Sequence, residues 1–309
     1  EDAVGLLNYY EYITSYRGTT ASEGYLNNEL YWWTLTPYSS SNVRFISNYG
    51  IAVSDDDPTG AGGVRPSINL KASVKIISGN GTVDNPYRLN GDDDTNLSGT
   101  LLNTRYSGEY IRFGVGENNL YRIVSHENGT GTKITSAEPL KKGVTFIESA
   151  FGSNTTFSST NTIGTFLNND YLNPVNGYLT NEDIAMIEDS TTWYLGIVGS
   201  GSSYKLAKYT DTTGTTLTSS ATTSKVGLLR IGELMAGQFD RYGNNINFWL
   251  LTPFDTLIVR FGDYYGGAGN GNEPTFIYGI RPCLNLKSNV VITEGDGTLQ
   301  NPYILTLDS

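Results

Sequence analysis

The chain contains one sequence unit twice, and this repeat limits the folds that it can adopt. Residues 32–89 align with residues 248–305 without a gap, and 27 of the 58 aligned positions are identical. A second match, of residues 4–7 with residues 226–229, extends both copies toward the N-terminus. Self-similarity of this length indicates two copies of one structural unit, so both copies should form the same elements.

The two copies differ in what precedes them. Residues 108–225, about 118 residues, come before the second copy and have no counterpart ahead of the first. With 309 residues the chain is long enough for two modest domains. We therefore expect a first module over residues 1–90 that has only the C-terminal half, a linker over 91–107, and a complete second module over 108–309.

Within each copy, a fixed frame encloses a stretch that has changed. The frame WxLTP…VRF spans residues 33–45 and again 249–261, whereas residues 38–42 and 254–258 inside it differ at every position. Frame residues of this kind indicate a common scaffold. The enclosed residues then form a loop whose side chains are free to differ between the copies.

Local patterns predict mostly strands. WWTLTP and VRF alternate and end at turns, residues 109–124 form a predicted hairpin, and residues 64–77 and 280–293 each read as one alternating core strand. Turns rich in Gly, Asn and Pro follow in both copies.

Helical signals are fewer. Residues 166–172 predict a short helix, and Thr180 with Asp183 predicts a capping box at the start of another. Apolar spacing after residues 4–7 and 226–229 also indicates a helix in each copy. The segment 200–224 predicts a hairpin or loop.

Composition excludes several partners. The net charge is −11 with only 20 Lys and Arg, so a nucleic-acid backbone would be repelled. No stretch approaches 18 apolar residues, and we expect no membrane insertion by this segment. A single Cys excludes an internal disulfide. Low Lys content together with many Tyr, Thr, Asn and Gly is typical of bacterial surface proteins.

An ordered set of motifs carries a family resemblance. It consists of GEYIRF at 108–113, LYRIV at 120–124, FLNNDYLN at 166–173, KVGLL at 225–229, WLLTP at 249–253 and GIRPCLNL at 279–286. The set resembles a domain of unknown function of Gram-positive bacterial surface proteins, sometimes found behind pilin-like anchors. The WxLTP…GxRP half is also similar to the C-type-lectin-like fold of formylglycine-generating enzymes and of bacterial and phage adhesins.

The resemblance implies a fold and a function. The fold would be α+β, with two C-type-lectin-like modules that are β-rich, with short helices and long loops, the first being truncated or reduced. The function would be that of a secreted, non-enzymatic adhesin on the cell surface. Alternatives are a structural subunit of a surface filament or pilus, with contacts between copies of the chain, and, with less support, an enzyme.

The variable loops, residues 38–42 with 48–62 and residues 254–258 with 263–278, are the candidate ligand-binding surface for a glycan or protein ligand. They combine Tyr with Ser, Asn, Gly and Asp, the mixture that gives rigid contact area together with adaptable hydrogen bonds. The competing interpretation is that they are ordinary solvated loops. The candidate residues are Tyr38, Asn42, Tyr49, Tyr264, Tyr265, Asn270 and Tyr278.

Catalytic and metal chemistry have few candidates. Cys283 aligns with Ser67 on a predicted strand, which favours a buried small residue, and His126 follows a strand in an expected exposed turn. A thiol nucleophile needs a base, and zinc needs three or four N or S ligands, so we expect no catalytic residue and no cofactor.

Calcium is the one metal with a candidate site. Asp55, Asp56 and Asp57 could supply oxygen ligands, although a solvated acidic turn is the competing interpretation. Arg65 and Arg281 each precede Pro at the start of a strand, and we expect both to link a loop to the scaffold.

The missing half of the first module predicts an uncovered surface. Residues 1–16 should expose an apolar face and a strand edge, which recruits partners. Three explanations remain open: the upstream half was cleaved but stays bound, a neighbouring copy supplies it in a filament, or the module covers itself against the second through the linker. Burial of Leu6, Leu7, Tyr10 and Ile13 within one chain would support the last.

Overall fold

The structure is a computed structural model in which strands make up most of the regular structure. It describes residues 4–8, 11–12, 26, 30–48, 54–60, 62–70, 74–82, 84–89, 97–126, 131–195, 221–230, 233–234, 246–262 and 271–308. We call residues 4–89 the first unit, residues 97–308 the second unit, and residues 97–195 of the latter the front segment.

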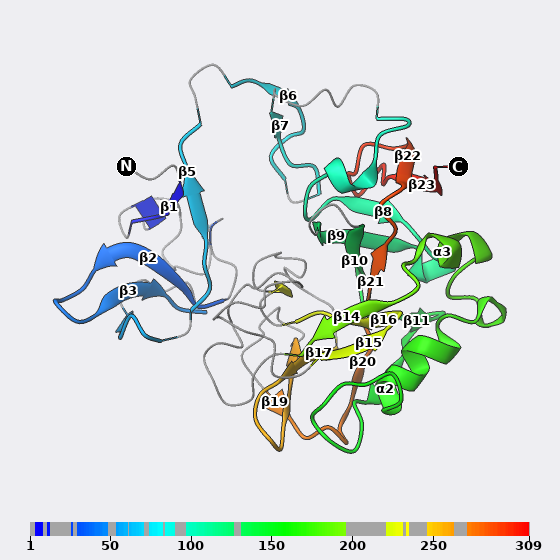
Figure 1. The fold of residues 1–309 in the computed structure, drawn as a ribbon. Coiled ribbons are helices and arrows are strands. Elements are labelled where there is room, and N and C mark those ends of the chain that lie inside the picture. The colour runs from blue at the N-terminus through cyan, green and yellow to red at the C-terminus, as the bar shows by residue number, and fades with distance from the viewer. Residues whose placement is uncertain are drawn as a thin grey trace.

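The first unit contains three small sheets (Figure 1). Strands β2, β3 and β4 form one sheet, β1 pairs with β5, and β6 pairs with β7. The strands are β1 (Val4–Leu6), β2 (Trp32–Pro37), β3 (Val43–Ile46), β4 (Ser54–Asp56), β5 (Pro66–Ile68), β6 (Ile76–Ser78) and β7 (Arg88–Leu89).

The second unit is built around two five-stranded sheets, ordered β16-β21-β10-β9-β8 and β13-β20-β17-β18-β19. Its strands in the front segment are β8 (Tyr110–Arg112), β9 (Leu120–His126), β10 (Thr132–Ser136), β11 (Lys141–Lys142), β12 (Thr145–Phe146), β13 (Glu148–Ala150) and β14 (Thr191–Tyr194). The later strands are β15 (Ala221–Ser224), β16 (Val226–Leu228), β17 (Phe248–Pro253), β18 (Val259–Gly262), β19 (Gly271–Asn272), β20 (Ile277–Gly279), β21 (Pro282–Leu286), β22 (Val290–Glu294) and β23 (Ile304–Leu307).

Helices are short wherever the structure describes them. They are the 3-10 helices Leu102–Thr104, Gly116–Asn118 and Pro174–Asn176, the π-helix Phe166–Asp170, and the α-helices α2 (Thr162–Thr165) and α3 (Asn181–Met186). The predicted capping box at Thr180 and Asp183 starts α3, and the predicted hairpin over 109–124 is β8–β9; both are confirmed.

The expected α+β class with two C-type-lectin-like modules is wrong. In the described residues the strands fall into eight sheets of two to five strands, and none closes into a barrel. The longest described α-helix has six residues. The physical reason lies in the sequence, where short alternating runs are interrupted by Gly, Asn and Pro turns, so few segments are long enough to form a helical layer.

One predicted strand is also wrong in each copy. The alternating stretch 280–293 forms two strands, β21 and β22, because the chain turns between them and the Val290 N–H donates to the Lys287 carbonyl at 3.2 Å. In the first unit the described part of 64–77 divides between β5 and β6 in the same way. The sequence predicted one strand in each copy because the alternation of apolar and polar residues continues through the turn from one strand into the next.

The repeat is preserved in strand register. Trp33 pairs with Phe45 as Trp249 pairs with Phe261, and both hairpins have an irregularity before the Pro. Strand β1 pairs with β5 through Val4 and Ile68, as β16 pairs with β21 through Val226 and Leu284. The two copies therefore form the same strand pairs, and they differ in how deeply those strands are buried.

Burial separates the copies. Ile68 is 58% exposed whereas its counterpart Leu284 is 0% exposed, and Leu70 is 55% exposed whereas Leu286 is 0% exposed. The other pairs of exposed and buried counterparts are Val4 and Val226, Leu35 and Leu251, Val64 and Ile280, Ile76 and Ile292, and Tyr87 and Tyr303. Trp33 is likewise half-buried, whereas its counterpart Trp249 is fully buried.

The front segment is what buries the second copy. Strand β10 lies antiparallel to β21 on the side opposite β16, and Tyr303 exchanges backbone hydrogen bonds with Tyr110 and Arg112. Leu97 and Leu102 are buried here, and the Gly99 N–H donates to the Ile292 carbonyl, so the described part of the expected linker packs on the second unit.

Two buried cationic side chains help to tie the front segment to the repeated part. Arg281, 1% exposed, donates from Nε to the Ser136 carbonyl at 2.7 Å and from Nη2 to the Ala137 carbonyl at 3.0 Å. This matches the expected role of an Arg that links a loop to the scaffold. Lys133 on β10 forms a buried ion pair with Glu233, Nζ to Oε1 at 2.6 Å.

By comparison, the first unit has a small core. It consists of Tyr12, Trp32 and Ile46, with Leu7 and Leu26 packed against it. Of the four residues expected to decide the fate of the missing half, Leu6 and Leu7 are half-buried, while Tyr10 and Ile13 lie outside the described residues. Of the apolar face expected over residues 1–16, Val4 is exposed, whereas Tyr12 is fully buried. Ile68 and Ile76 are also exposed, although the alternating stretch 64–77 predicted a core strand.

The burial difference predicts unequal costs for one substitution at equivalent positions. Leu284→Ala should destabilise the protein by about 2–5 kcal/mol, because it leaves a cavity in a packed core. Ile68→Ala should cost under about 1 kcal/mol, since its side chain is largely in solvent. Urea unfolding of both variants measures this, and equal losses would contradict it.

The ion pair between Lys133 and Glu233 predicts that the stability of the protein depends on pH. Burial by itself raises the pKa of Glu233, but Lys133 and Arg230 outweigh it and lower the pKa from 4.5 to about 2. The pair thus stabilises the fold above about pH 4.5, and the contribution is lost as pH falls toward 2.

We expect Glu233→Gln to cost about 3–5 kcal/mol at pH 7, because Lys133 is left buried without its anion. The matched control is Glu11→Gln, since Glu11 accepts from the Asn8 N–H as Glu233 accepts from the Arg230 N–H, yet Glu11 is exposed. Thermal unfolding at pH 7 and pH 3 checks both. A Glu233→Gln penalty that grows in acid would contradict the assignment.

Candidate functional site

The two variable loops in the frame have the same backbone turn. In the first tip, residues 38–42, the Tyr38 N–H donates to the Asn42 carbonyl at 2.9 Å. In the second tip, residues 254–258, the Phe254 N–H donates to the Ile258 carbonyl at 3.0 Å. The frame therefore fixes the turn, although all five side chains differ.

A side-chain acceptor at the second position closes each turn. In the first tip, Ser39 Oγ accepts from the N–H groups of Ser41 and Asn42 at 3.2 and 3.1 Å. In the second, Asp255 Oδ1 accepts from the N–H groups of Leu257 and Ile258 at 2.7 and 2.9 Å. Ser and Asp are both turn formers by this mechanism, which explains how one can replace the other.

The frame Arg supports the first residue of each tip. Arg44 Cζ lies 4.9 Å from the centre of the Tyr38 ring, and Arg260 Cζ lies 4.4 Å from the centre of the Phe254 ring. Such cation–π contacts orient the ring. The Arg residues of the VRF motif therefore hold an aromatic ring at the base of a variable loop.

The chemistry of the tips then diverges. In the first, Asn42 Nδ2 donates to Asp55 Oδ2 at 2.7 Å. In the second, Ile258 replaces Asn42 and Gly271 replaces Asp55, and a Cβ at Gly271 would lie 3.0 Å from Ile258 Cδ1. The first tip is thus polar with an exposed Tyr38, and the second is apolar with an exposed Leu257.

The acidic residues beside the first tip bond locally. Asp57 Oδ1 accepts from the N–H and hydroxyl of Thr59, which lowers the pKa of Asp57, and Asp56 Oδ1 accepts from the Asp57 N–H. Within the described ranges, no group of three or more acidic, His or Cys residues is arranged to hold a metal ion. Asp55 and Asp56 lie in β4, and Asp57 begins the turn that follows it.

The remaining candidate residues separate into two sets. Tyr49, Tyr264, Tyr265 and Asn270 lie outside the described residues. Tyr278 is half-buried, with its ring 4.7 Å from Trp249 and 4.8 Å from Phe261, and its hydroxyl accepts from Asn272 Nδ2 at 2.7 Å. The rings of Trp249 and Phe261 thus cover part of the Tyr278 ring, so Tyr278 is less accessible to a ligand than the exposed Tyr38.

Neither candidate for catalysis has catalytic surroundings. Cys283 is fully buried in β21, as predicted, and burial raises the pKa of its thiol to about 12. His126 was expected in an exposed turn, but it is half-buried at the end of β9, with Nδ1 3.0 Å from Thr132 Oγ1 and Nε2 against the Arg105 carbonyl. Burial lowers its pKa.

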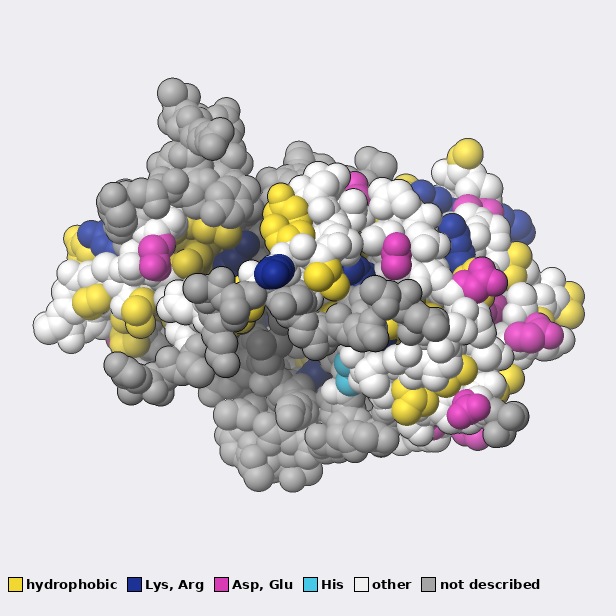
Figure 2. Space-filling view, turned by 90° about the horizontal axis from the view of Figure 1, so that it is seen from above, with side chains coloured by type: hydrophobic (Ala, Val, Ile, Leu, Met, Phe, Trp, Pro, Cys, Tyr) yellow, Lys and Arg dark blue, Asp and Glu magenta, His cyan; other side chains and the backbone are white. Residues whose placement is uncertain are grey.

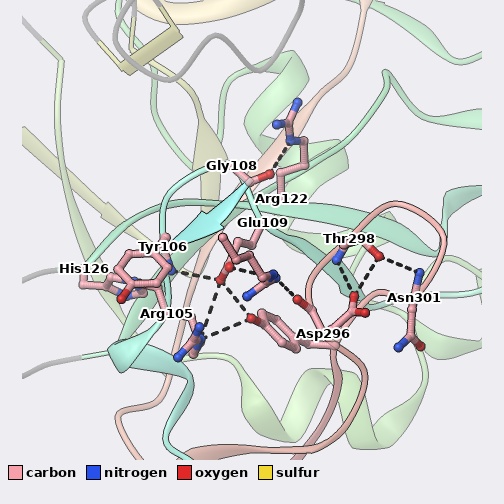
Figure 3. A network of polar contacts seen from close by, with 11 residues as sticks. Arg105, Tyr106, Gly108, Glu109, Arg122, His126, Asp296, Thr298 and Asn301 are labelled. Carbon is pink, nitrogen blue, oxygen red and sulfur yellow. Dashed lines mark hydrogen bonds and ion pairs between the residues drawn. The ribbon is translucent and has the colours of Figure 1, made fainter. Parts of the chain in front are cut away.

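A polar network that the sequence did not reveal joins the two units (Figure 3). Its centre is Glu109, whose Oε2 accepts from the Tyr106 N–H at 3.0 Å and from the Tyr303 hydroxyl at 3.0 Å. Arg105 Nε lies 3.7 Å from the same oxygen, and Arg88 of the first unit lies 3.2 Å from Oε1. Figure 3 shows these groups converging on one carboxylate.

Arg88 makes the network a connection between units. Besides the ion pair, it donates to the Asp296 carbonyl in the turn before β23. Burial raises the pKa of Glu109, while its N–H, Arg and Tyr partners act in the opposite direction. Every oxygen of Glu109 thus has a donor, so the arrangement can fasten β7 to the second unit. A repeat comparison would flag Arg88, because its counterpart is the apolar Ile304.

Comparisons with known proteins agree with part of the expected resemblance. Residues 8–72 match the family described as Domain of unknown function (DUF6273). This covers the part of the first unit with the WxLTP and GVRP motifs, and residues 230–288 are its counterpart in the repeat. Searches of curated proteins and of solved structures gave no match. No described helix combines the length and apolar character needed to cross a membrane.

The network predicts an effect of Arg88 on stability. Arg88→Leu should cost about 1–3 kcal/mol, because the carboxylate of Glu109 and the carbonyl of Asp296 both lose a donor. Arg112→Leu is a suitable control, since Arg112 is exposed and its side chain donates to the nearby Asn119 Oδ1, so the substitution should change stability by no more than about 0.5 kcal/mol. Urea unfolding at pH 7 that showed the same midpoint for both variants would contradict the role of Arg88.

Proposed function

We propose that the protein is a non-enzymatic recognition protein that binds a ligand through the tips of its frame hairpins. The observation that carries this proposal is the pair of tips, in which one backbone turn presents two chemically different sets of exposed side chains. Binding modules use a rigid scaffold with substitutable loops for the same reason, since the loops can change without cost to the fold.

The first tip has the chemistry of a sugar-binding surface. The Tyr38 ring is 53% exposed and is held by Arg44, and exposed Ser hydroxyls surround it. An aromatic ring can stack on the apolar face of a pyranose while hydroxyl and amide groups bond to its hydroxyls. A glycan on a host or neighbouring cell is therefore the favoured ligand, and a protein ligand is the alternative.

The family resemblance carried by the motifs supports an extracellular location for this binding activity. A domain of Gram-positive surface proteins would act outside the cell, as an adhesin. A structural role in a surface filament is the second candidate, and it is favoured by a specific observation, the exposed apolar residues of the first unit.

Substitution of Tyr38 tests the proposal. On an array of immobilised oligosaccharides, with and without calcium, Tyr38→Ala should weaken binding by about tenfold or more, because it removes the stacking ring. Tyr87→Ala is the matched control, since both Tyr side chains are 53% exposed and only Tyr38 belongs to a tip. Both variants should keep the parent melting temperature.

Three results would overturn the proposal. They are an array with no bound glycan together with no binding to immobilised host surface proteins, equal loss of binding in both variants, and unfolding of Tyr38→Ala. Binding to proteins alone, lost with Tyr38→Ala, would replace the glycan by a protein ligand.

A further inference from the structure

The first unit exposes a face of apolar residues whose counterparts in the second unit are buried against the front segment. The residues of this face, which we call the docking face, are Val4, Val64, Ile68, Leu70, Ile76 and Tyr87, and all are largely exposed. Their counterparts in the second unit are all buried, most of them beneath the front segment. The docking-face residues have nevertheless stayed apolar or aromatic in the first unit, where they are exposed. Figure 2 shows hydrophobic side chains at the surface of the part that the first unit forms, at the left of the view.

The strand edge of this face is equivalent to an edge that is paired in the second unit. Strand β21 has β16 on one side and β10 on the other, in a register that sets Ile134 opposite Leu284. Strand β5 has β1 on the side that corresponds to β16, and within the described ranges it has no strand on the other. An exposed edge of this kind accepts an added strand through its backbone groups.

The first unit also keeps the two side chains that bind the front segment in the second. Arg65 corresponds to Arg281, which donates to the Ser136 and Ala137 carbonyls, and it keeps the same stacking, with Cζ 5.1 Å from the Trp32 ring against 5.3 Å from Phe248 for Arg281. Glu11 corresponds to Glu233, the partner of Lys133. Arg65 also donates from Nη1 to the Leu26 carbonyl within the first unit. The first unit therefore keeps the charged residues, and the ring beneath the Arg, that accompany a front segment in the second.

We propose that the docking face binds a polypeptide segment of the same kind as residues 97–195, supplied from outside the 309 residues. The segment adds a strand antiparallel to β5, covers the apolar side chains, and places a Lys opposite Glu11. A second molecule of the 309-residue chain is a less suitable occupant. Its own front segment is already paired with β21 of its second unit, so that segment is not available to bind β5 of another molecule.

A fused chain tests the proposal without dissecting the protein. Residues 97–225 are added in front of Val4 of the full chain, so that they precede β1 as the original residues 97–225 precede β16. In this chain the amides of residues 67–70 should exchange with solvent about a hundredfold more slowly than in the parent chain, because β5 gains a second neighbouring strand.

Two substitutions decide whether the protection comes from the proposed contacts. Ile68→Asp should return exchange in the fused chain to the parent rate, yet leave the melting temperature of the parent chain unchanged. Glu11→Lys should also remove the protection, and combining it with Lys133→Glu in the added copy should restore it. Restoration by the double change would not follow from a general loss of stability.

Other outcomes overturn the proposal. One is a fused chain in which the amides of residues 67–70 exchange as in the parent. Another is protection that survives Ile68→Asp. A third is a parent chain that dimerises reversibly, measured by light scattering, with the same amides protected in the dimer, since the occupant would then be a second copy.

Discussion

The antiparallel pairing of β10 with β21 is the contact on which the second unit depends. It joins a segment that precedes the repeat to the central strand of the repeated part, and it places Ile134, Leu284 and Leu286 in one core. Arg281 and Lys133 add charged hydrogen bonds at either side of this pairing. Because a buried cation is costly without partners, these two residues also penalise any other register between the segments.

Much of the scaffold could be predicted because its signals are local. The repeat, the frame hairpins, β8–β9 and the capping box of α3 all follow from alternation, turn residues or spacing within a few positions. The class of the fold could not be predicted in the same way. It depends on how short strands group into sheets, and alternation is the same in a strand that stands alone and in one that joins a large sheet.

The candidate site shows the same division. The sequence singled out the first tip, since its residues change inside a fixed frame, and the structure explains why they can change. It did not reveal the burial of Tyr278 on Trp249, nor the gathering of Arg88, Arg105 and Tyr303 around Glu109, because these contacts join residues far apart in the chain. Comparing the two copies anticipated an uncovered surface in residues 1–16, which holds Val4 of the docking face. The exposure of Ile68 and Ile76 was not anticipated, because their alternating pattern is the same as that of the buried copy.

The order of the segments has a consequence for how the chain folds during synthesis. The first unit leaves the ribosome before the front segment, and the repeated part of the second unit leaves last. When residues 97–195 emerge, the only compatible edge then available is β5, not β21. Early docking there would be an off-pathway state that must dissociate before β10 can pair with β21. An occupied docking face would prevent this trap, so a partner that covers the first unit would also act as a chaperone for the second.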